Sequence, residues 1–228
     1  MSHLINIFWE PGKVFAELKE KPTFWLPLLL TVALVMVMTL AYFSKVDSDW
    51  FIDHSLSASG NEMSAKEIAD AKKVMPSAKV QGYIGAPAAA IGISIFMLLL
   101  ALYYMLAGKI TGVAISFRHG LSLTAWSGVP GLLGMIVALV GVFTMTPQTP
   151  LESLMLTNVD PLFVQLPIDH AWSSFVKSLN LLTLWTIFLA ALGWRVWGKT
   201  SWVQAITVAA LPSILIYGGM ALWALTKS

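Results

Sequence analysis

The sequence contains no cysteine, which excludes disulfides, Cys-ligated zinc or iron–sulfur clusters, and thiol catalysis. This absence leaves the cellular compartment open, because a chain without cysteine is compatible with any redox state. Charged residues are also scarce, at 11% of the chain against about 25% in a soluble domain. The formal net charge is only +2, and no basic cluster is present. We therefore expect no nucleic-acid partner.

Catalytic and metal-binding motifs are missing as well. No G-x-S-x-G, Walker A or dinucleotide-binding pattern occurs, and no two histidines stand three or four residues apart. We therefore expect no enzyme, no cofactor and no metal site. One alternative stays open, a weak divalent-cation site formed by His54 and its neighbouring acids with His170. Hydrated acidic loops are the more usual outcome of such a pattern.

Apolar residues, by contrast, make up 57% of the chain, and the mean hydropathy is +0.75. A helix needs about 20 mostly apolar residues to cross a bilayer. Five such runs leave too little polar sequence to cover a soluble globule. The sequence therefore predicts an all-α, polytopic membrane protein: one domain over residues 1–228, built as a five-transmembrane-helix bundle. Its predicted spans are 23–44, 82–107, 121–145, 172–196 and 202–225.

Basic residues in the short loops predict the orientation. Lys109 with Arg118 and Arg195 with Lys199 mark two short turns, whereas the loop 146–171 has no Lys or Arg. We therefore expect a cytoplasmic N-terminus, a C-terminus outside, and two outer loops at 45–81 and 146–171. The chain does not begin like a signal peptide, so the first span is expected to be retained.

The segment 7–21 is amphipathic. Val14, Phe15 and Leu18 share one helical face, while the charged side chains lie elsewhere. Pro11 suits the first turn of this helix and Pro22 its end. We expect a helix in the membrane interface that anchors the first span, and the alternative is a docking site for a partner.

Further features concern helix ends, kinks and contacts. Ser64 and Glu67 have the spacing of a capping box at the start of a helix that Pro76 would stop. Pro130 and Pro212 should kink or loosen their spans. Small residues recur every four positions and allow close helix contact. They are Ala86/Ala90/Ser94, Ser127/Gly131, Gly134/Ala138 and Ala205/Ala209.

Three polar residues are candidates for functional positions in or beside the spans. Lys177 and Asn180 stand three apart on one face of the fourth predicted span, and Arg118 lies in a short inner turn. Lys177 would reach the outer surface, and Asn180 would form an interhelical hydrogen bond. The alternative is that this pair forms a transport site.

The order of several motifs resembles the Yip1-domain family in its bacterial form. They are Pro11-Gly12-Lys13-Val14-Phe15, Glu17-Leu18, Lys21-Pro22, Phe117 in the turn 108–120, Trp126 before Pro130, Ser178-Leu179-Asn180, Trp185 and Gly193. The resemblance covers nearly the whole chain. It implies five helices with a cytoplasmic N-terminus and, for the bacterial form, the cytoplasmic (inner) membrane.

Eukaryotic relatives in this family sit in Golgi and endoplasmic-reticulum membranes, bind Rab-type GTPases, and form homo- and hetero-complexes. They carry a long cytosolic N-terminal region, whereas only residues 1–22 precede the first predicted span here. We therefore do not expect the GTPase interaction to carry over.

The expected function is that of a non-enzymatic scaffold or adaptor that organises membrane proteins or lipids. Its expected partners are the bilayer, other membrane proteins and further copies of itself. The alternative is a small permease or lipid-translocating protein that works as an oligomer.

Overall fold

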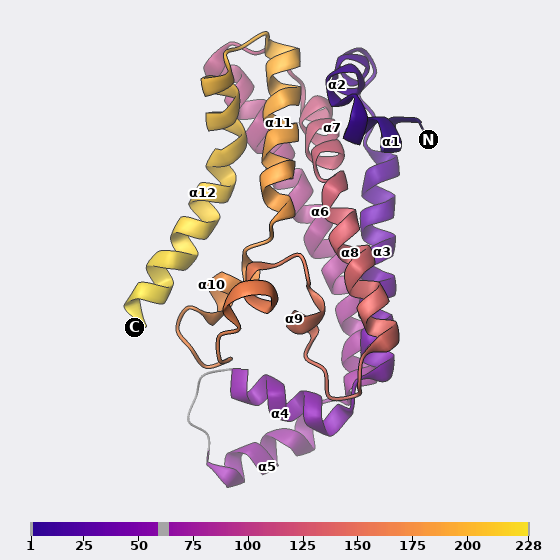
Figure 1. Ribbon diagram of the computed structural model, residues 1–228, viewed down its shortest axis with the longest axis vertical. Helices are drawn as coiled ribbons and strands as arrows, with labels where there is room; N and C mark the ends of the chain where they lie inside the picture. The colour runs from indigo at the N-terminus through magenta and orange to yellow at the C-terminus, as the bar shows by residue number, and fades with distance from the viewer. Residues whose placement is uncertain (1, 59–63, 228) are drawn as a thin grey trace. The chain divides into compact units, whose positions relative to one another are not determined.

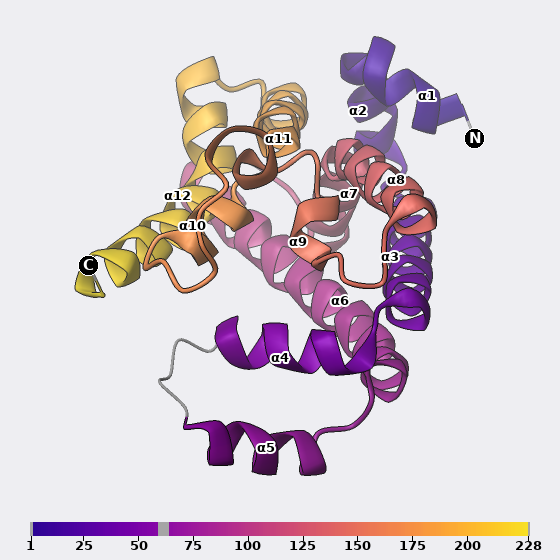
Figure 2. The ribbon, with the colours of Figure 1, turned by 60° about the horizontal axis from the view of Figure 1, so that its bottom comes forward.

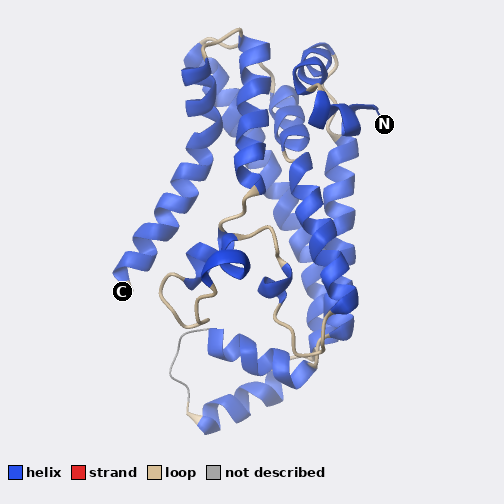
Figure 3. Ribbon diagram, viewed as in Figure 1, coloured by secondary structure: helices blue, strands red, loops and turns tan. Residues whose placement is uncertain are grey.

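The computed structural model describes residues 2–58 and 64–227, so residues 59–63 of the predicted outer loop 45–81 lie outside it. The regular elements of these residues are all helices (Figure 3), and the only extended pairing among them is the isolated bridge between Asn158 and Asn180. The all-α prediction is confirmed. The helices are α1 (Ser2–Trp9), α2 (Pro11–Glu20), α3 (Trp25–Lys45), α4 (Ser48–Ala58), α5 (Ala65–Val74), α6 (Ala78–Thr111), α7 (Phe117–Ser127), α8 (Val129–Thr144), α9 (Leu151–Leu154), the π-helical turn η1 (Asp160–Val164), α10 (Ser173–Ser178), α11 (Leu182–Gly198) and α12 (Trp202–Thr226) (Figure 1).

Long apolar helices confirm a polytopic membrane protein. Among the described residues α3, α6 and α12 are each long and apolar enough to cross a bilayer. Helices α7 and α8 together form a fourth candidate, bent by 41° where Gly128 and Pro130 interrupt the run. The kink predicted at Pro130 is thus observed. Helix α11 has 17 residues, at the lower end of the usual range of about 17–25. The number of five spans therefore stays a prediction.

The fourth predicted span, 172–196, is not one helix. Its first part forms the six-residue helix α10, the chain is extended at Leu179, and α11 begins only at Leu182. Asn158 explains the break, because its side-chain amide donates to the carbonyl of Lys177 at 2.7 Å. The backbone N–H of Val159 likewise donates to the Leu179 carbonyl at 2.8 Å. These carbonyls therefore have partners outside a helix, a competition that hydropathy alone does not register.

The chain divides into two compact units. Unit 1 comprises residues 2–33, 91–133 and 181–219; unit 2 comprises residues 34–58, 64–90, 134–180 and 220–227. Helices α3, α6, α8 and α12 contribute residues to both.

Unit 1 has an aromatic-rich core to which α1 and α2 belong. Its largest fully buried side chains are Trp126, Trp194, Phe15, Ile7, Leu18, Leu123 and Leu189. Helix α2 packs against α11 and α7. The amphipathic segment predicted at 7–21 is therefore two helices, α1 and α2, separated at Glu10. It contributes its apolar side chains to a protein core.

Unit 2 is built around Tyr42, Val46, Ala78, Val142 and Leu154, which form one buried apolar cluster. Beside it, α4 and α5 lie next to each other (Figure 2) and are joined by an ion pair of 2.6 Å between Lys72 Nζ and Asp53 Oδ1. The predicted capping box is present at the start of α5, where the Ser64 hydroxyl accepts from the Glu67 N–H. The loop 146–171 is irregular apart from α9 and η1, as its prolines predict.

Candidate functional site

The predicted stripe of α2 is completely buried inside unit 1. Val14 is 1% exposed, and Phe15 and Leu18 are 0% exposed. Gly193 of α11 allows α2 to pack this closely. A Cβ at this position would come within 2.5 Å of Leu123 Cδ1 and 2.8 Å of Phe15 Cδ1. Only glycine leaves room for Phe15 at this position. The stripe therefore packs against other helices of the same chain. The expectation that this segment lies in the membrane interface stays a prediction.

Hydrogen bonds from the neighbouring helices fix α2 by its backbone. The Trp197 ring N–H donates to the carbonyl of Phe15 at 2.6 Å, and Lys19 Nζ donates to the carbonyl of Trp197 at 2.7 Å. The two helices are thus tied in both directions. Such bonds to a helix backbone fix its register as well as its position.

Helix α7 holds the chain where α2 ends. His119 Nδ1 faces the N–H of Ser116, which can only donate, so the proton of this imidazole lies on Nε2. Nε2 in turn donates to the Lys19 carbonyl at 3.0 Å. Arg118 Nε donates to the carbonyl of Pro22 at 3.0 Å. The Lys19 carbonyl is one of those that a helix end leaves unpaired, and the Pro22 carbonyl lies just beyond the end of α2.

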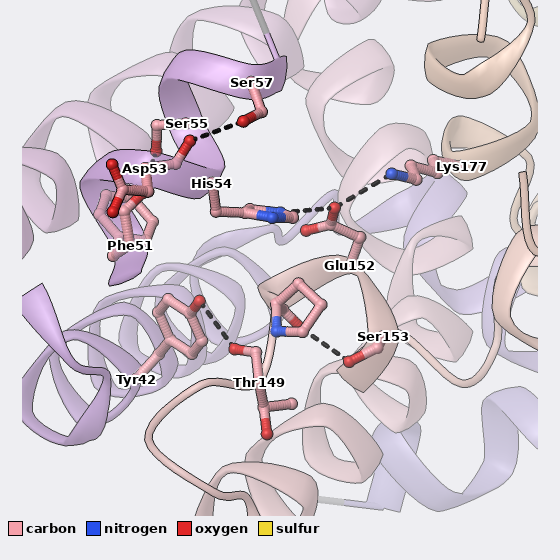
Figure 4. A network of polar contacts seen from close by, with 11 residues as sticks. Tyr42, Phe51, Asp53, His54, Ser55, Ser57, Thr149, Glu152, Ser153 and Lys177 are labelled. Carbon is pink, nitrogen blue, oxygen red and sulfur yellow. Dashed lines mark hydrogen bonds and ion pairs between the residues drawn. The ribbon is translucent and has the colours of Figure 1, made fainter. Parts of the chain in front are cut away.

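A second polar site lies in unit 2, centred on Glu152 of α9. Glu152 Oε1 accepts from Lys177 Nζ of α10 at 3.0 Å and lies 3.1 Å from His54 Nε2 of α4 (Figure 4). The three side chains are 29%, 19% and 23% exposed, respectively. One carboxylate oxygen therefore links three separate helices. His54 also stacks on Trp50, with ring centroids 4.9 Å apart.

The environment of Glu152 favours its charged form. Burial by itself would raise the pKa of this carboxyl. A backbone hydrogen bond, the hydrogen bond and charge of Lys177, and the hydrogen bond of His54 together outweigh burial and hold the pKa below its ordinary value. Glu152 is thus a carboxylate held in place by cationic and N–H partners. A charged, fixed carboxylate can accept hydrogen bonds from a cationic ligand.

A cavity of about 360 Å³ opens beside this cluster, and we call it the Glu152 cavity. Its polar wall contains a second carboxylate, Asp160 of η1, which is 6% exposed. Asp160 Oδ1 accepts from the backbone N–H of Leu166 at 3.0 Å. Gln165 follows η1 in the left-handed region, with φ of 54°, and turns the chain along the cavity wall.

The structure separates the predicted polar candidates. Lys177 belongs to the short helix α10 and pairs with Glu152 at 19% side-chain exposure, so its ammonium has a partner within the chain. That it reaches the outer surface stays a prediction. Asn180 lies outside any helix, where its amide donates to Asn158 Oδ1 at 2.7 Å and to Thr157 Oγ1 at 2.9 Å. Lys177 and Asn180 therefore do not share a helix face. Arg118 has a structural partner, the Pro22 carbonyl.

The divalent-cation alternative does not match the arrangement of the described side chains. His54 is paired with Glu152, and His170 Nδ1 accepts from the N–H of Trp172 at 3.1 Å. Over residues 2–58 and 64–227, no three His, Asp or Glu residues are grouped as metal ligands.

The sequence does not predict the Glu152 cluster, because its members are far apart in the chain and none of them stands in a recognisable motif. Glu152 and His54 are 98 residues apart, and Glu152 and Lys177 are 25 apart. It does not reveal the role of Trp197 either, because the ring N–H meets the Phe15 carbonyl 182 residues earlier in the chain. Only the Pro150 that precedes α9 hints at a helix start near Glu152.

Comparison with known proteins agrees with the helical membrane architecture. The chain is 24% identical over 213 residues to "Membrane protein YknW" of Bacillus subtilis (strain 168), covering 89% of this chain and 83% of that protein. No solved structure matches the chain. Neither the family nor this relative carries the name of an enzyme. The Yip1 domain model matches residues 5–223, nearly the whole chain, so this integral membrane protein belongs to the Yip1 domain family.

Proposed function

We propose that this protein is a non-enzymatic scaffold or adaptor that organises partner membrane proteins. In this proposal five helices cross a bacterial cytoplasmic membrane, with the N-terminus inside and the C-terminus outside. The observation that supports it is the rigid attachment of α1 and α2 to unit 1. An adaptor needs a surface whose shape is fixed before the partner arrives, since ordering that surface on binding would reduce affinity.

Helix α1 carries the surface in question. Ile7 on one side is 0% exposed, and Phe8 meets Trp185 edge to face at 5.2 Å. Ile5 and Trp9, four residues apart and therefore on one face, are 64% and 81% exposed. Tryptophan is the side chain most enriched among residues that dominate binding energy at interfaces. The face of Ile5 and Trp9 is the one we propose for a partner membrane protein.

Site-specific crosslinking in native membranes tests this function. A photoreactive residue at Ile5 in the full chain should capture a discrete membrane protein, identified by mass spectrometry, and Trp9→Ala should reduce that capture. The same residue at Lys66 of α5, a position exposed in unit 2, is the control and should not capture it. Crosslinks from Ile5 to lipid alone, or equal capture from Lys66, would contradict the scaffold role.

The permease alternative was motivated by Lys177 and Asn180 on one face of a span. Both side chains have local partners in unit 2, Glu152 for Lys177 and Asn158 for Asn180. We therefore do not propose a transport site there.

A further inference from the structure

We propose that the Glu152 cavity binds a primary ammonium group, and that the amino headgroup of a phospholipid supplies it. The proposal concerns unit 2 alone and uses none of the residues assigned to the scaffold. Its test can therefore fail or succeed independently of the test at Ile5.

The charge of the cavity favours a cationic guest. Its wall carries two carboxylates, Glu152 and Asp160, and one ammonium, Lys177, which leaves one net negative charge when His54 is neutral. Both partners of Glu152 contact the same oxygen, Oε1. Apart from the backbone hydrogen bond that Glu152 makes to its own carboxylate, no other described residue pairs with Glu152 Oε2 or with Asp160 Oδ2. An ammonium group supplies N–H donors of the kind that these acceptors lack.

A primary amine suits these acceptors better than a quaternary one. An R–NH₃⁺ group has three N–H donors, and charge-assisted hydrogen bonds to carboxylate are short and about twice as strong as neutral ones. A trimethylammonium group has the same charge without a donor. It is typically held by the faces of Trp, Tyr or Phe, and none of these three residue types is among the described residues that line this cavity.

The size and the second charge of the cavity fit a zwitterionic headgroup. At about 360 Å³ it is near the lower end of the range of about 300–1,000 Å³ for small-molecule sites. Lys177 uses one hydrogen bond on Glu152, and an ammonium has three donors. Its remaining donors can meet the phosphate that neighbours the amine in such a lipid.

An apolar turn beside the cavity favours a lipid over a soluble amine. Within η1, Asp160 and Pro161 line the cavity, and Gln165 lines it directly after the turn. Between them Leu162, Phe163 and Val164 are 44%, 72% and 45% exposed. Three adjacent exposed apolar side chains in a membrane protein are best covered by acyl chains. A lipid whose headgroup occupied the cavity could cover this turn with its own chains.

Native mass spectrometry of the full chain in detergent tests the proposal with three lipids that share their acyl chains. Phosphatidylethanolamine should bind at least about tenfold more tightly than phosphatidylcholine, the difference expected for a single strong hydrogen bond. Phosphatidylglycerol, which is anionic and has no amine, should not exceed phosphatidylcholine. Equal binding of the ethanolamine and choline lipids would overturn the proposal without any variant.

Two substitutions locate the binding. Asp160→Asn keeps an oxygen for the Leu166 N–H, and Glu152→Gln keeps the shape of the side chain; each should abolish most of the preference for the ethanolamine lipid. Asp53→Asn on α4 is the matched control, because Asp53 pairs with Lys72 and does not line the cavity. A preference that survives in both cavity variants, or falls equally in the control, would contradict the assignment.

Soluble amines distinguish the two sources of the ammonium. Ethanolamine should displace the bound lipid only at concentrations far above those of the lipid, and choline should not displace it at all. If ethanolamine binds as tightly as the lipid, the lipid source is wrong. If choline competes as well as ethanolamine, the ammonium chemistry itself is wrong.

Discussion

Helices α2 in unit 1 and α9 in unit 2 are both short, and each is fixed by contacts with elements distant in the sequence. Apolar burial fixes α2, with Phe15 and Leu18 fully enclosed and backbone carbonyls bound by Trp197 and His119. Helix α9 combines an apolar contact, Leu154 in the buried cluster of unit 2, with charge, because the single oxygen Oε1 of Glu152 contacts His54 and Lys177 at partial exposure. Apolar burial changes little with pH, whereas an ion cluster weakens when its acid is protonated. The comparison predicts that the stability of unit 1 changes little with pH, whereas the stability of unit 2 around α9 falls when Glu152 is protonated.

The largest expected effect is that of Phe15→Asp. An unpaired charge would replace a ring that is 0% exposed, and truncating a buried Phe alone costs about 3–5 kcal/mol. We expect α1 and α2 to leave unit 1, so that trypsin cleaves at Lys13 and Lys19 much faster while the long helices stay inserted. Ala16→Asp puts the same charge on the exposed face of α2 and should have little effect. Unchanged proteolysis in Phe15→Asp would show that the segment is already free.

Gly193→Ala should have the next largest effect, because the new methyl would press on Phe15 and Leu123. Overpacking of this kind costs about 1–3 kcal/mol. The measurement is the thermal unfolding midpoint, followed together with tryptic cleavage at Lys19. Gly218→Ala on α12 is the control, because a Cβ there meets nothing within 4 Å. Equal shifts for the two variants would contradict close packing at Gly193.

Glu152→Gln should destabilise unit 2 by about 1–2 kcal/mol, between the values for exposed and fully buried ion pairs, because the cluster is partly solvated. Hydrogen exchange at α9 and α10 should quicken, while exchange at α2 should not. Asp70→Asn removes the exposed pair with Lys73 within α5 and should be nearly neutral. If Asp70→Asn destabilised unit 2 as much as Glu152→Gln does, the Glu152 cluster would contribute no more to stability than an exposed ion pair.

Trp197→Phe removes the N–H that donates to the Phe15 carbonyl, and the smaller ring also leaves part of a buried site unfilled, because Trp197 is 3% exposed. The hydrogen bond alone contributes about 1 kcal/mol, the net value of a typical hydrogen bond, so we expect a cost of at least that size. Hydrogen exchange within α2 reports it, and Trp25→Phe, at a ring that is 61% exposed, is the control. No change at α2 would show that this hydrogen bond does not contribute to the attachment of α2.

Much of the fold follows from local sequence rules, and the sites follow only in part. The capping box of Ser64 and Glu67, the bend beside Pro130 and the buried face of Val14, Phe15 and Leu18 depend on neighbours within a few residues. The hydropathy pattern likewise predicts the long helices. It does not show that the Phe15 face of α2 packs against protein and not against lipid, because the membrane interior and a protein core are both apolar.

The features that the sequence did not predict depend on residues far apart in the chain. The break before α11 requires Asn158 to reach the carbonyl of Lys177, 19 residues away. The Glu152 cluster joins three helices through charges that, read one at a time, look like solvated loop residues. Pairing between distant segments is a property of the folded chain, so no local pattern specifies it.

Hydrogen exchange at two pH values tests the central comparison most directly. The folded-state pKa of Glu152 lies below its ordinary value of 4.5, so its contribution to stability is present above that value and is lost as the pH falls through the lowered pKa. Helix α2 also carries titrating contacts, the Glu17–His3 pair and the bond from His119 to the Lys19 carbonyl, so the comparison uses the buried turn from Val14 to Leu18. Between about pH 6 and about pH 3.5, exchange corrected for its intrinsic rate should quicken more at α9 and α10 than at this turn, and Glu152→Gln should reduce the difference. Equal acceleration at α2, or an unchanged rate at α9 and α10 in the native protein, would contradict the account.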